Sequence, residues 1–507
     1  MTTEVSAKPV VLIVGAGIMG GGIAQIAARH GHDVLMFDIQ PERVKACVED
    51  IRSQLEQLIQ RGKFSAADVE PLLTRIKPLD RLEDARDARV VIEAVVEDLQ
   101  TKRSLFIALE KIVGPECILA TNTSSISVTA IGKALETPGR LVGMHFFNPA
   151  QIMKLVEVVS GLKSDPKVVE SIFHLAKAWG KTPIRAKSTP GFVVNRIARP
   201  FYAEALLLLQ EQFASAGEID SCIRAAGFRM GPCELMDLIG HDTNFAVTRS
   251  VFDSNFYDKR FVPSLIQHEL VEGGLYGRKT GLGLFDYSAD QLPTKTAAAQ
   301  NDTGLPLPSS ITVNGRGTVP DFLREALAAQ NISTNINAGA DWSGLVADEI
   351  QIRVTDGRPA SQVAADEGIR NIAVVDWMPA PKSGMSIAWA CAAQADDQTA
   401  AVVQALLSRV GCNAVAVRDY PGLAVARTLS MIINEAADAV VQGVCTDEDA
   451  DLAMTLGTNY PAGPFQWLKY LTAAPVLSTL NALNDFYRGE RYRVSPGLRE
   501  RGWKASI

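Results

Sequence analysis

Histidine and cysteine are scarce in this sequence, and neither is arranged as a metal site or a disulfide frame. The 507 residues include six histidines and seven cysteines. No two cysteines have the CxxC spacing, and the histidines lack the spacings typical of metal ligands. Scattered cysteines in odd number fit free thiols in a reducing compartment better than a secreted, disulfide-bonded protein. We expect no bound metal.

Long apolar runs and a surplus of positive charge are also absent. No apolar segment reaches the ~18 residues that a membrane-spanning helix needs. The formal net charge of −7 gives no electrostatic reason to expect binding to nucleic acid or to an anionic membrane. The short polar stretch before residue 9 does not resemble a signal peptide. The sequence therefore indicates a cytoplasmic globular protein, and its length suggests roughly three domains.

Residues 10–38 contain the stretch around which the rest of the chain is organised. An apolar run, Val10–Val14, is followed without a spacer by a glycine-rich turn and a helical segment. The turn consists of Gly15, Ala16, Gly17, Ile18, Met19 and Gly20. In a dinucleotide-binding unit the first glycine allows the tight turn, the second lets the backbone approach the pyrophosphate, and the third lets the helix pack on the strand. The helix N-terminus then faces the phosphates.

Asp38 ends the second apolar run, where an acidic side chain can accept hydrogen bonds from an adenosine ribose. A GxGxxG turn alone is weak evidence, because ordinary glycine-rich turns share it. Strand, turn, helix, strand and acid in this order make dinucleotide binding the better interpretation. An aspartate would repel the ribose phosphate of NADP, and no arginine directly follows it. The sequence thus predicts NAD as the cofactor.

Further apolar runs alternate with helical patterns up to residue 187, which predicts a parallel doubly wound sheet. The expected strands cover residues 89–94, 117–121, 141–145, 153–159 and 182–186. Ligands bind beyond the carboxyl ends of the strands in such sheets, and Glu97, Ser124 and His145 fall there. A helix pair after the second strand ends in a turn with Arg61 and Lys63. This turn is either a solvated basic turn or a contact for an anionic ligand.

The second half of the sequence has the pattern of a worn copy of the first. After a Pro-rich linker, residues 311–320 repeat the opening strand and glycine turn. The segment PGFVVNR at 190–196 returns as PGLAVAR at 421–427, which indicates duplication of a whole unit. In the copy, Ala426 replaces Asn195. Aligning residues 384–388 with residues 143–147 leaves no histidine opposite His145.

These patterns predict an α/β Rossmann-type sheet, an all-α domain, and a degenerate second copy of both. The expected boundaries are 1–187 for the NAD-binding domain, 188–287 for the helical domain, 288–310 for a linker, 311–415 for a degenerate α/β domain and 416–507 for a second helical domain.

The first 287 residues resemble the 3-hydroxyacyl-CoA dehydrogenases of β-oxidation. The family's motifs occur in order and without a large gap: GAGIMG, VIEAVVED, NTSS, MHFFNPA, MKLVEVV, TPGFVVNR and GRKTGLGLFDY. The full layout is similar to the long bacterial members, which include 3-hydroxybutyryl-CoA enzymes and the 3-hydroxyadipyl-CoA enzymes of phenylacetate catabolism. The resemblance implies NAD-dependent oxidation of an L-3-hydroxyacyl-CoA to the 3-oxoacyl-CoA, in fatty-acid or phenylacetate catabolism.

The resemblance also assigns the chemistry to matching residues. His145 would be the general base that takes the 3-hydroxyl proton as hydride leaves for NAD. Glu157 would hydrogen-bond the far ring nitrogen of His145. Burying an acid in an apolar strand is costly without a partner, which favours this pairing over an ordinary core histidine. Ser124 would hydrogen-bond the substrate oxygen, and Asn195 would reach both the substrate and the histidine.

The binding residues follow from the same resemblance. The cofactor positions are Gly15, Gly17, Ile18, Met19, Gly20, Asp38, Glu97, Lys102 and Asn122. The acyl-CoA positions are Ser124, Asn195, Arg61 and Lys63, the last two near the CoA phosphates. Glu97 and Lys102 would lie near the nicotinamide ribose, although an exposed charge pair is the alternative. Ser124 could instead cap the next helix, but Ser125 or Ser127 is better placed for that.

Single-unit members of the family commonly dimerise through the helical domain. A second helical domain in the same chain could occupy that surface and form a pseudo-dimer, and a homodimer is also compatible with the sequence. Two other functions stay open at this point. One is an oxidoreductase of the wider β-hydroxyacid class acting on free acids, many of which use a lysine as the base. The other is a non-enzymatic, crystallin-like binding protein, which the retained catalytic positions disfavour.

Overall fold

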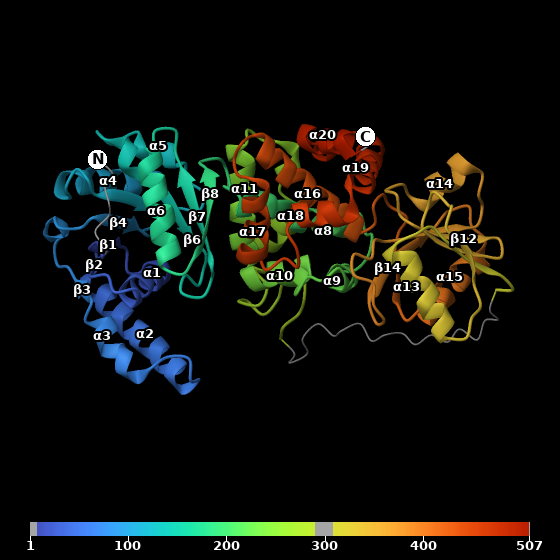
Figure 1. Ribbon diagram of the computed structural model, residues 1–507, viewed down its shortest axis with the longest axis horizontal. Helices are drawn as coiled ribbons and strands as arrows, with labels where there is room; N and C mark the ends of the chain where they lie inside the picture. The colour runs from blue at the N-terminus through green and yellow to red at the C-terminus, as the bar shows by residue number, and fades with distance from the viewer. Residues whose placement is uncertain (1–7, 289–307, 506–507) are drawn as a thin grey trace. The chain divides into compact units, whose positions relative to one another are not determined.

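The computed structural model describes residues 8–288 and 308–505, and the chain divides into two compact units. Unit 1 contains the residues up to Arg196 together with Gln442–Thr458, and unit 2 contains Ile197–Val441 and the residues from Asn459 onward. Figure 1 labels many of the helices and strands of both. The predicted linker and the polar N-terminal stretch lie largely outside the described residues.

Unit 1 is built on an eight-stranded sheet in the order β3-β2-β1-β4-β5-β6-β7-β8. Its strands are β1 (Val11–Val14), β2 (Val34–Phe37), β3 (Ile76–Pro78), β4 (Val90–Glu93), β5 (Ile118–Thr121), β6 (Leu141–Phe146), β7 (Leu155–Ser160) and β8 (Thr182–Lys187). Its main helices are α1 (Ile18–Arg29), α2 (Pro41–Gln60), α3 (Val69–Leu73), α4 (Leu99–Ile112), α5 (Val128–Gly132), α6 (Pro166–Ala178) and α17 (Asp447–Gly457). From β3 to β6, neighbouring strands pair in parallel, as the alternating pattern predicted.

The predicted parallel arrangement fails at one point of the sheet, between β6 and β7. Strand β7 runs antiparallel to β6, and β8 runs parallel to β7. No helix separates β6 from β7, and a short connection can return the chain only in the antiparallel direction. This register places His145 directly opposite Glu157. The short edge strand β3 was not predicted either.

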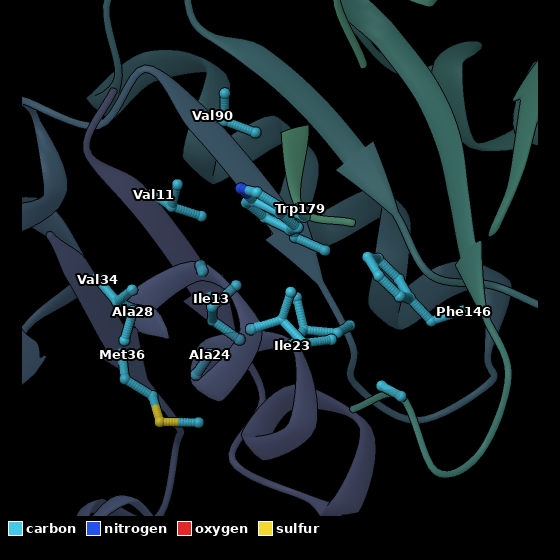
Figure 2. Close-up of a cluster of buried hydrophobic side chains, with 14 of the residues drawn as sticks. Val11, Ile13, Ile23, Ala24, Ala28, Val34, Met36, Val90, Phe146 and Trp179 are labelled. Atoms are coloured by element: carbon cyan, nitrogen blue, oxygen red, sulfur yellow. The ribbon is translucent and has the colours of Figure 1, made fainter. Parts of the chain in front are cut away.

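The core of unit 1 lies between the sheet and helix α1. Strands β1 and β4 are buried along their whole length, which explains their continuous apolar sequences. Figure 2 shows Ile13 and Val90 of the sheet with Ile23 of α1, and Trp179 and Phe146 in the same cluster. This buried core fixes the strands whose carboxyl ends carry the candidate site.

Unit 2 contains the second sheet, in the order β10-β9-β11-β12-β13-β14-β15. Its strands are β9 (Ile311–Asn314), β10 (Asn335–Asn337), β11 (Gly344–Ala347), β12 (Ile350–Val354), β13 (Ile372–Val375), β14 (Ser386–Cys391) and β15 (Asn413–Ala416), with helices α13 (Thr318–Ala329), α14 (Ala360–Glu367) and α15 (Asp397–Arg409). Strands β13, β14 and β15 repeat the directions of β6, β7 and β8. Strand β11 has no such counterpart, because it runs antiparallel to both of its neighbours.

Helices from both repeats pack on one another in unit 2. They are α8 (Arg199–Gln210), α9 (Ala216–Ala225), α10 (Pro232–Ile239), α11 (His241–Ser254), α12 (Leu265–Glu272), α16 (Val425–Val441), α18 (Pro464–Leu471), α19 (Ala473–Tyr487) and α20 (Pro496–Ala505). The central contact joins α8 of the first repeat to α16 of the second. A short helix, α7 (Val194–Ile197), begins in unit 1 and ends at the first residue of unit 2.

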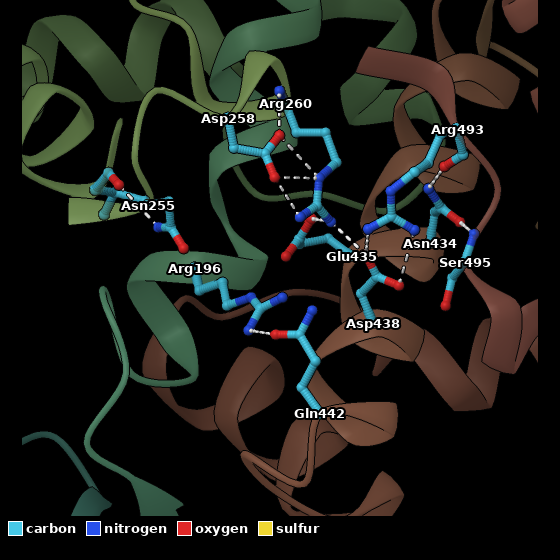
Figure 3. A network of polar contacts seen from close by, with 11 residues as sticks. Arg196, Asn255, Asp258, Arg260, Asn434, Glu435, Asp438, Gln442, Arg493 and Ser495 are labelled. Carbon is cyan, nitrogen blue, oxygen red and sulfur yellow. Dashed lines mark hydrogen bonds and ion pairs between the residues drawn. The ribbon is translucent and has the colours of Figure 1, made fainter. Parts of the chain in front are cut away.

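Buried ion pairs reinforce the contacts between the two repeats within unit 2. Glu204 on α8 is fully buried, and its carboxylate bonds the Arg427 Nε at 2.6 Å and the Arg491 Nη2 at 2.7 Å. In a second cluster, Arg260 contacts Glu435 at 3.0 Å and also contacts Asp438, as Figure 3 shows. Because a buried charge is costly alone, each cluster ties residues of the first repeat to residues of the second.

Candidate active site

His145 and Glu157 form a buried pair at the centre of the site. The Nδ1 atom of His145 lies 2.6 Å from Oε2 of Glu157, and the two residues are 6% and 1% exposed. A carboxylate can only accept here, so the proton of a neutral imidazole sits on Nδ1. The Nε2 atom is then unprotonated and can accept a proton. The hydrogen-bonded pair that the resemblance implied is therefore present.

The second oxygen of Glu157 is held by the chain that enters the helical region. Oε1 accepts hydrogen bonds from the backbone N–H groups of Val193 and Val194, each at 3.0 Å. These bonds fix the carboxylate and leave Oε2 for the imidazole. Asn195 is the next residue in the chain after Val194, and it belongs to α7. Phe192, whose ring centroid is 5.9 Å from that of His145, precedes them.

Glu97 and Lys102 belong to a buried ion-pair network, so the alternative of an exposed charge pair is wrong for Lys102. Lys102 is 1% exposed, and its Nζ bonds Oε1 of Glu93 at 2.6 Å and Oε2 of Glu97 at 3.2 Å. Oε1 of Glu97 accepts from the Thr123 hydroxyl at 2.6 Å and from the Ser124 N–H at 2.9 Å. Burial raises the pKa of Glu97, but Lys102 and these hydrogen bonds outweigh it and hold the pKa below its usual range. Glu97 thus fixes the loop that carries Ser124.

Asn122 and Ser127 secure the two ends of that loop. The Asn122 Oδ1 accepts from the Phe146 N–H at 2.8 Å, which joins the end of β5 to the residue after His145. Ser127 caps α5 by accepting from the Ala130 N–H at 3.2 Å. The prediction that Ser125 or Ser127 suits the cap better than Ser124 is confirmed for Ser127. Ser124 follows β5, and His145 lies near the end of β6, so both are at the carboxyl edge of the sheet.

The glycine turn fits a dinucleotide. Gly15 has a positive φ of 107°, and a Cβ there would lie 2.5 Å from the Ala94 carbonyl oxygen. A Cβ on Gly20 would lie 1.8 Å from the Gly15 carbonyl oxygen, so only glycine allows the helix this close to the turn. Gly17 has open space where a side chain would point, and no side chain caps α1. The helix N-terminus can therefore receive phosphate oxygens.

Asp38 and Ile18 flank this turn. The Asp38 Oδ2 accepts from the Ala16 N–H at 2.8 Å, which places the carboxylate beside the turn, where a ribose would bind. The Ile18 side chain, next to the partly buried Met19, is 79% exposed, and Ile39 and Val96 are similarly exposed just beyond β2 and β4. Exposed apolar side chains at the carboxyl ends of three strands provide surfaces for planar rings.

Arg61 and Lys63 are not joined to the rest of the site within unit 1. They lie in an exposed turn after α2, around Gly62 with a φ of 67°. Figure 1 shows α2 and α3 projecting from the sheet. An exposed turn is compatible with both interpretations, a solvated basic turn and a contact for a phosphate group.

Residues outside the predicted set also support the site. Glu93 bonds Lys102, and Thr123 bonds Glu97. The ring of His145 contacts those of Phe147 and Phe192. An acid at the end of an apolar strand, as in VVIE at β4, was a usable signal for Glu93, because such an acid needs a buried partner.

Three family models match most of the chain. The model of the "3-hydroxyacyl-CoA dehydrogenase, NAD binding domain" matches residues 10–189, and that of the C-terminal domain of the same family matches residues 191–287 and 422–503. A third model, the "3-hydroxybutyryl-CoA dehydrogenase reduced Rossmann-fold domain", matches residues 352–421. The chain belongs to the 3-hydroxyacyl-CoA dehydrogenase family.

Two individual relatives match nearly the whole chain, and a third matches about half of it. A 3-hydroxyadipyl-CoA dehydrogenase of Escherichia coli K12 is 41% identical over 492 residues, which cover 97% of each chain. The crystal structure of a 3-hydroxybutyryl-CoA dehydrogenase from E. coli K12 superposes with a TM-score of 0.88 at 39% identity, covering 98% of this chain and 99% of that one. A probable 3-hydroxybutyryl-CoA dehydrogenase of Bacillus subtilis is 37% identical over 278 residues, covering 55% of this chain and 96% of its own.

Family membership confirms the predicted fold class, the NAD cofactor and the enzyme class. This dehydrogenase oxidises a 3-hydroxyacyl-CoA with NAD, which decides against the free-acid and crystallin-like alternatives. Within residues 8–288 and 308–505, no helix is long and apolar enough to cross a membrane. The same residues contain no cluster of three or more histidine, cysteine or acidic side chains arranged to hold a metal.

The second half of this dehydrogenase has one aspartate where the first half has the His145–Glu157 pair. The predicted alignment of residues 384–388 with 143–147 is wrong, because β14 pairs as β7 does, and β13 corresponds to β6. Asp376 then takes the position of His145, and it lies opposite Ala388 as His145 lies opposite Glu157. The Asp376 carboxylate accepts from the N–H groups of Ala424 at 2.8 Å and Val425 at 2.7 Å. Asp376 thus makes backbone contacts like those of Glu157, and the second half has no histidine at the position of His145.

The nucleotide end of the second half has also lost its acid. The Gly315 N–H donates to the Asn337 carbonyl oxygen as the Gly15 N–H donates to that of Phe37. The residue after Asn337 is Ala338, which therefore stands where Asp38 stands in the first half.

Proposed function

We propose that His145 is the general base of this dehydrogenase and that Glu157 orients it. The observation that carries the proposal is the 2.6 Å contact between Nδ1 of His145 and Oε2 of Glu157, whose other oxygen is occupied by two backbone N–H groups. The Nε2 atom of His145 takes the proton of the 3-hydroxyl group. The negative charge of Glu157 stabilises the imidazolium that forms. NAD, when bound, accepts the hydride from C3 of the substrate.

The remaining predicted site residues bind and orient. Ser124 holds the substrate oxygen, and Asn195 reaches the same oxygen from the start of α7. Glu97, fixed by Lys102, supports the nicotinamide ribose, and Asn122 holds the strand end beside it. The adenosine ribose lies against Asp38, which selects NAD over NADP by charge repulsion. Arg61 and Lys63 are proposed contacts of the CoA phosphates.

The proposed substrate is a short-chain thioester, 3-hydroxybutyryl-CoA or 3-hydroxyadipyl-CoA. Support comes from two relatives in E. coli K12 that match nearly the whole chain. One is named a 3-hydroxyadipyl-CoA dehydrogenase and the other a 3-hydroxybutyryl-CoA dehydrogenase. A substrate with a free carboxylate at the end of its acyl chain would need a cation in the pocket. Lys102, the buried cation near Ser124, is already paired with Glu93 and Glu97.

We expect full-length enzyme to reduce NAD with 3-hydroxybutyryl-CoA and with 3-hydroxyadipyl-CoA, and to give no measurable rate with the free 3-hydroxy acids. The CoA moiety supplies binding energy that the free acids lack. NADH absorbance measures both rates, and the ratio of kcat/KM values for the two thioesters identifies the better substrate. Equal rates with thioester and free acid would contradict the proposal.

We also infer that the duplicated half acts as a built-in partner, so that the chain is a pseudo-dimer with one live site. The contact between α8 and α16 in unit 2 and the loss of the base at Asp376 support this. Calorimetric titration of the full chain should give one NADH per chain, because Ala338 cannot replace Asp38. Light scattering on the same sample should give the mass of one chain. Two nucleotides per chain would show that the second half still binds cofactor.

A further inference from the structure

A segment of the second repeat is part of unit 1, where it packs against β7, the strand that carries Glu157. Helix α17, which belongs to the second helical domain by sequence, contacts β7 and β8 of the first sheet. The chain before it is anchored twice. The Val444 carbonyl accepts from the Lys187 N–H at 3.0 Å. The Gln442 Oε1 accepts from Nη1 of Arg196 at 2.8 Å, as Figure 3 shows.

Gly457, the last residue of α17, makes the closest approach to the elements that hold Glu157. A Cβ on Gly457 would lie 2.8 Å from Cδ2 of Leu155 and 3.1 Å from Cγ2 of Val194. Leu155 begins β7, the strand that carries Glu157, and Val194 donates its N–H to the Glu157 carboxylate. The absent side chain therefore lets α17 press on both elements that fix this carboxylate.

The same packing occurs in the opposite sense in unit 2. Helix α9 of the first repeat contacts β14, the counterpart of β7, and its last residue, Ala225, packs against the core of the second sheet. Each helical repeat thus supplies one helix to the sheet of the other repeat. The sheet of the first repeat carries the base, and the sheet of the second does not.

We propose that residues 442–458 are a positioning element for the His145–Glu157 pair, so that the second half completes the active site of the first. Gly457 is the positioning residue that acts through Leu155 and Val194. The inference rests on the proposed role of the pair. In this arrangement a half without a base serves the reaction, because its helix fixes the carboxylate that orients the imidazole.

Gly457→Val in the full-length enzyme tests the proposal. The added side chain should displace Leu155 and Val194, and kcat should fall about ten- to hundredfold, because misplacement by about an ångström has that effect. NADH affinity, measured by calorimetry, should stay within about twofold, since the glycine turn lies at other strands. The downfield proton resonance of the Nδ1–H of His145, assigned with Glu157→Gln, should shift or disappear. Gly457→Val combined with Leu155→Val should recover part of kcat, because the shorter side chain makes room.

Ala225→Val is the matched control, because it enlarges the last residue of the equivalent helix against the sheet that lacks a base. It should leave kcat and the downfield resonance unchanged, even where it lowers the melting temperature equally. If Gly457→Val does not accumulate as folded protein, Gly457→Ala should show the same changes on a smaller scale. Unchanged kcat and resonance in the folded Gly457 variants, or equal losses in Ala225→Val, would overturn the proposal. If His145→Gln loses activity while the Gly457 variants are unaffected, this proposal fails and the proposed function stands. If His145→Gln stays active, the proposed function itself is refuted.

Discussion

His145→Gln should lower kcat by about 10²- to 10⁴-fold, the usual contribution of a positioned general base. Glutamine keeps a similar volume and can still hydrogen-bond Glu157, so the buried site stays filled. It has no basic nitrogen in place of Nε2 and cannot take the hydroxyl proton. NADH oxidation with a 3-oxoacyl-CoA and NAD reduction with the 3-hydroxyacyl-CoA should fall together, because the same group serves both directions.

The control for this prediction is cofactor binding. The glycine turn and Asp38 belong to β1, β2 and α1, whereas His145 lies on β6, so NADH affinity should be unchanged. Glu157→Gln should give a smaller loss of kcat, since the imidazole remains but its counter-charge is gone. A His145→Gln enzyme that turns over within about tenfold of wild type would show that another group accepts the proton.

The nucleotide-binding end of the fold was the easiest part to predict. The turn from Gly15 to Gly20 imposes local backbone geometry, and the buried strand before it has a continuous apolar sequence. Such signals are read within a few residues, so strand, turn and helix followed from the sequence directly. His145 and Glu157 were found through the family's motifs, because nothing local shows that two strands place them opposite each other.

The features that the sequence did not reveal depend on contacts distant along the chain. The antiparallel direction of β7 follows from a short connection whose path is not encoded in apolar periodicity. A lysine on a helix is usually exposed, but Lys102 is buried because it pairs with the buried Glu93. Asp376 was missed because strand pairing, and not sequence similarity, aligns it with His145. Each case is decided by which strands pair, or by which buried charges find a partner.

Glu204→Gln should lower the free energy of unfolding by about 3–5 kcal/mol, the range for breaking a buried ion pair from one side. The substitution keeps the shape of the side chain but removes its charge. Arg427, which is fully buried, and Arg491 would then lose their carboxylate partner. The Tyr492 hydroxyl, which donates to the Glu204 Oε2 at 3.0 Å, cannot compensate two cations. Urea unfolding at pH 7 measures the change.

Glu170→Gln provides the comparison, because Glu170 pairs with Arg185 at 2.7 Å on the surface, with both side chains about half exposed. An exposed pair contributes at most about 1 kcal/mol. If the two substitutions cost the same, the Glu204 cluster does not hold the helical repeats together as its burial indicates.

The cost of Glu204→Gln should also depend on pH in a defined direction. Burial raises the pKa of Glu204, but Arg491 and Arg427 outweigh it and hold the pKa below its usual range. A carboxylate whose pKa is lowered by folding stabilises the folded state above its unfolded pKa of about 4.3, and this stabilisation is lost as the pH falls further. The difference between wild type and variant should therefore be constant near neutral pH and shrink below about pH 4. A difference that stays constant down to pH 3 would mean that the cluster acts through the shape of its side chains and not through the charge of Glu204.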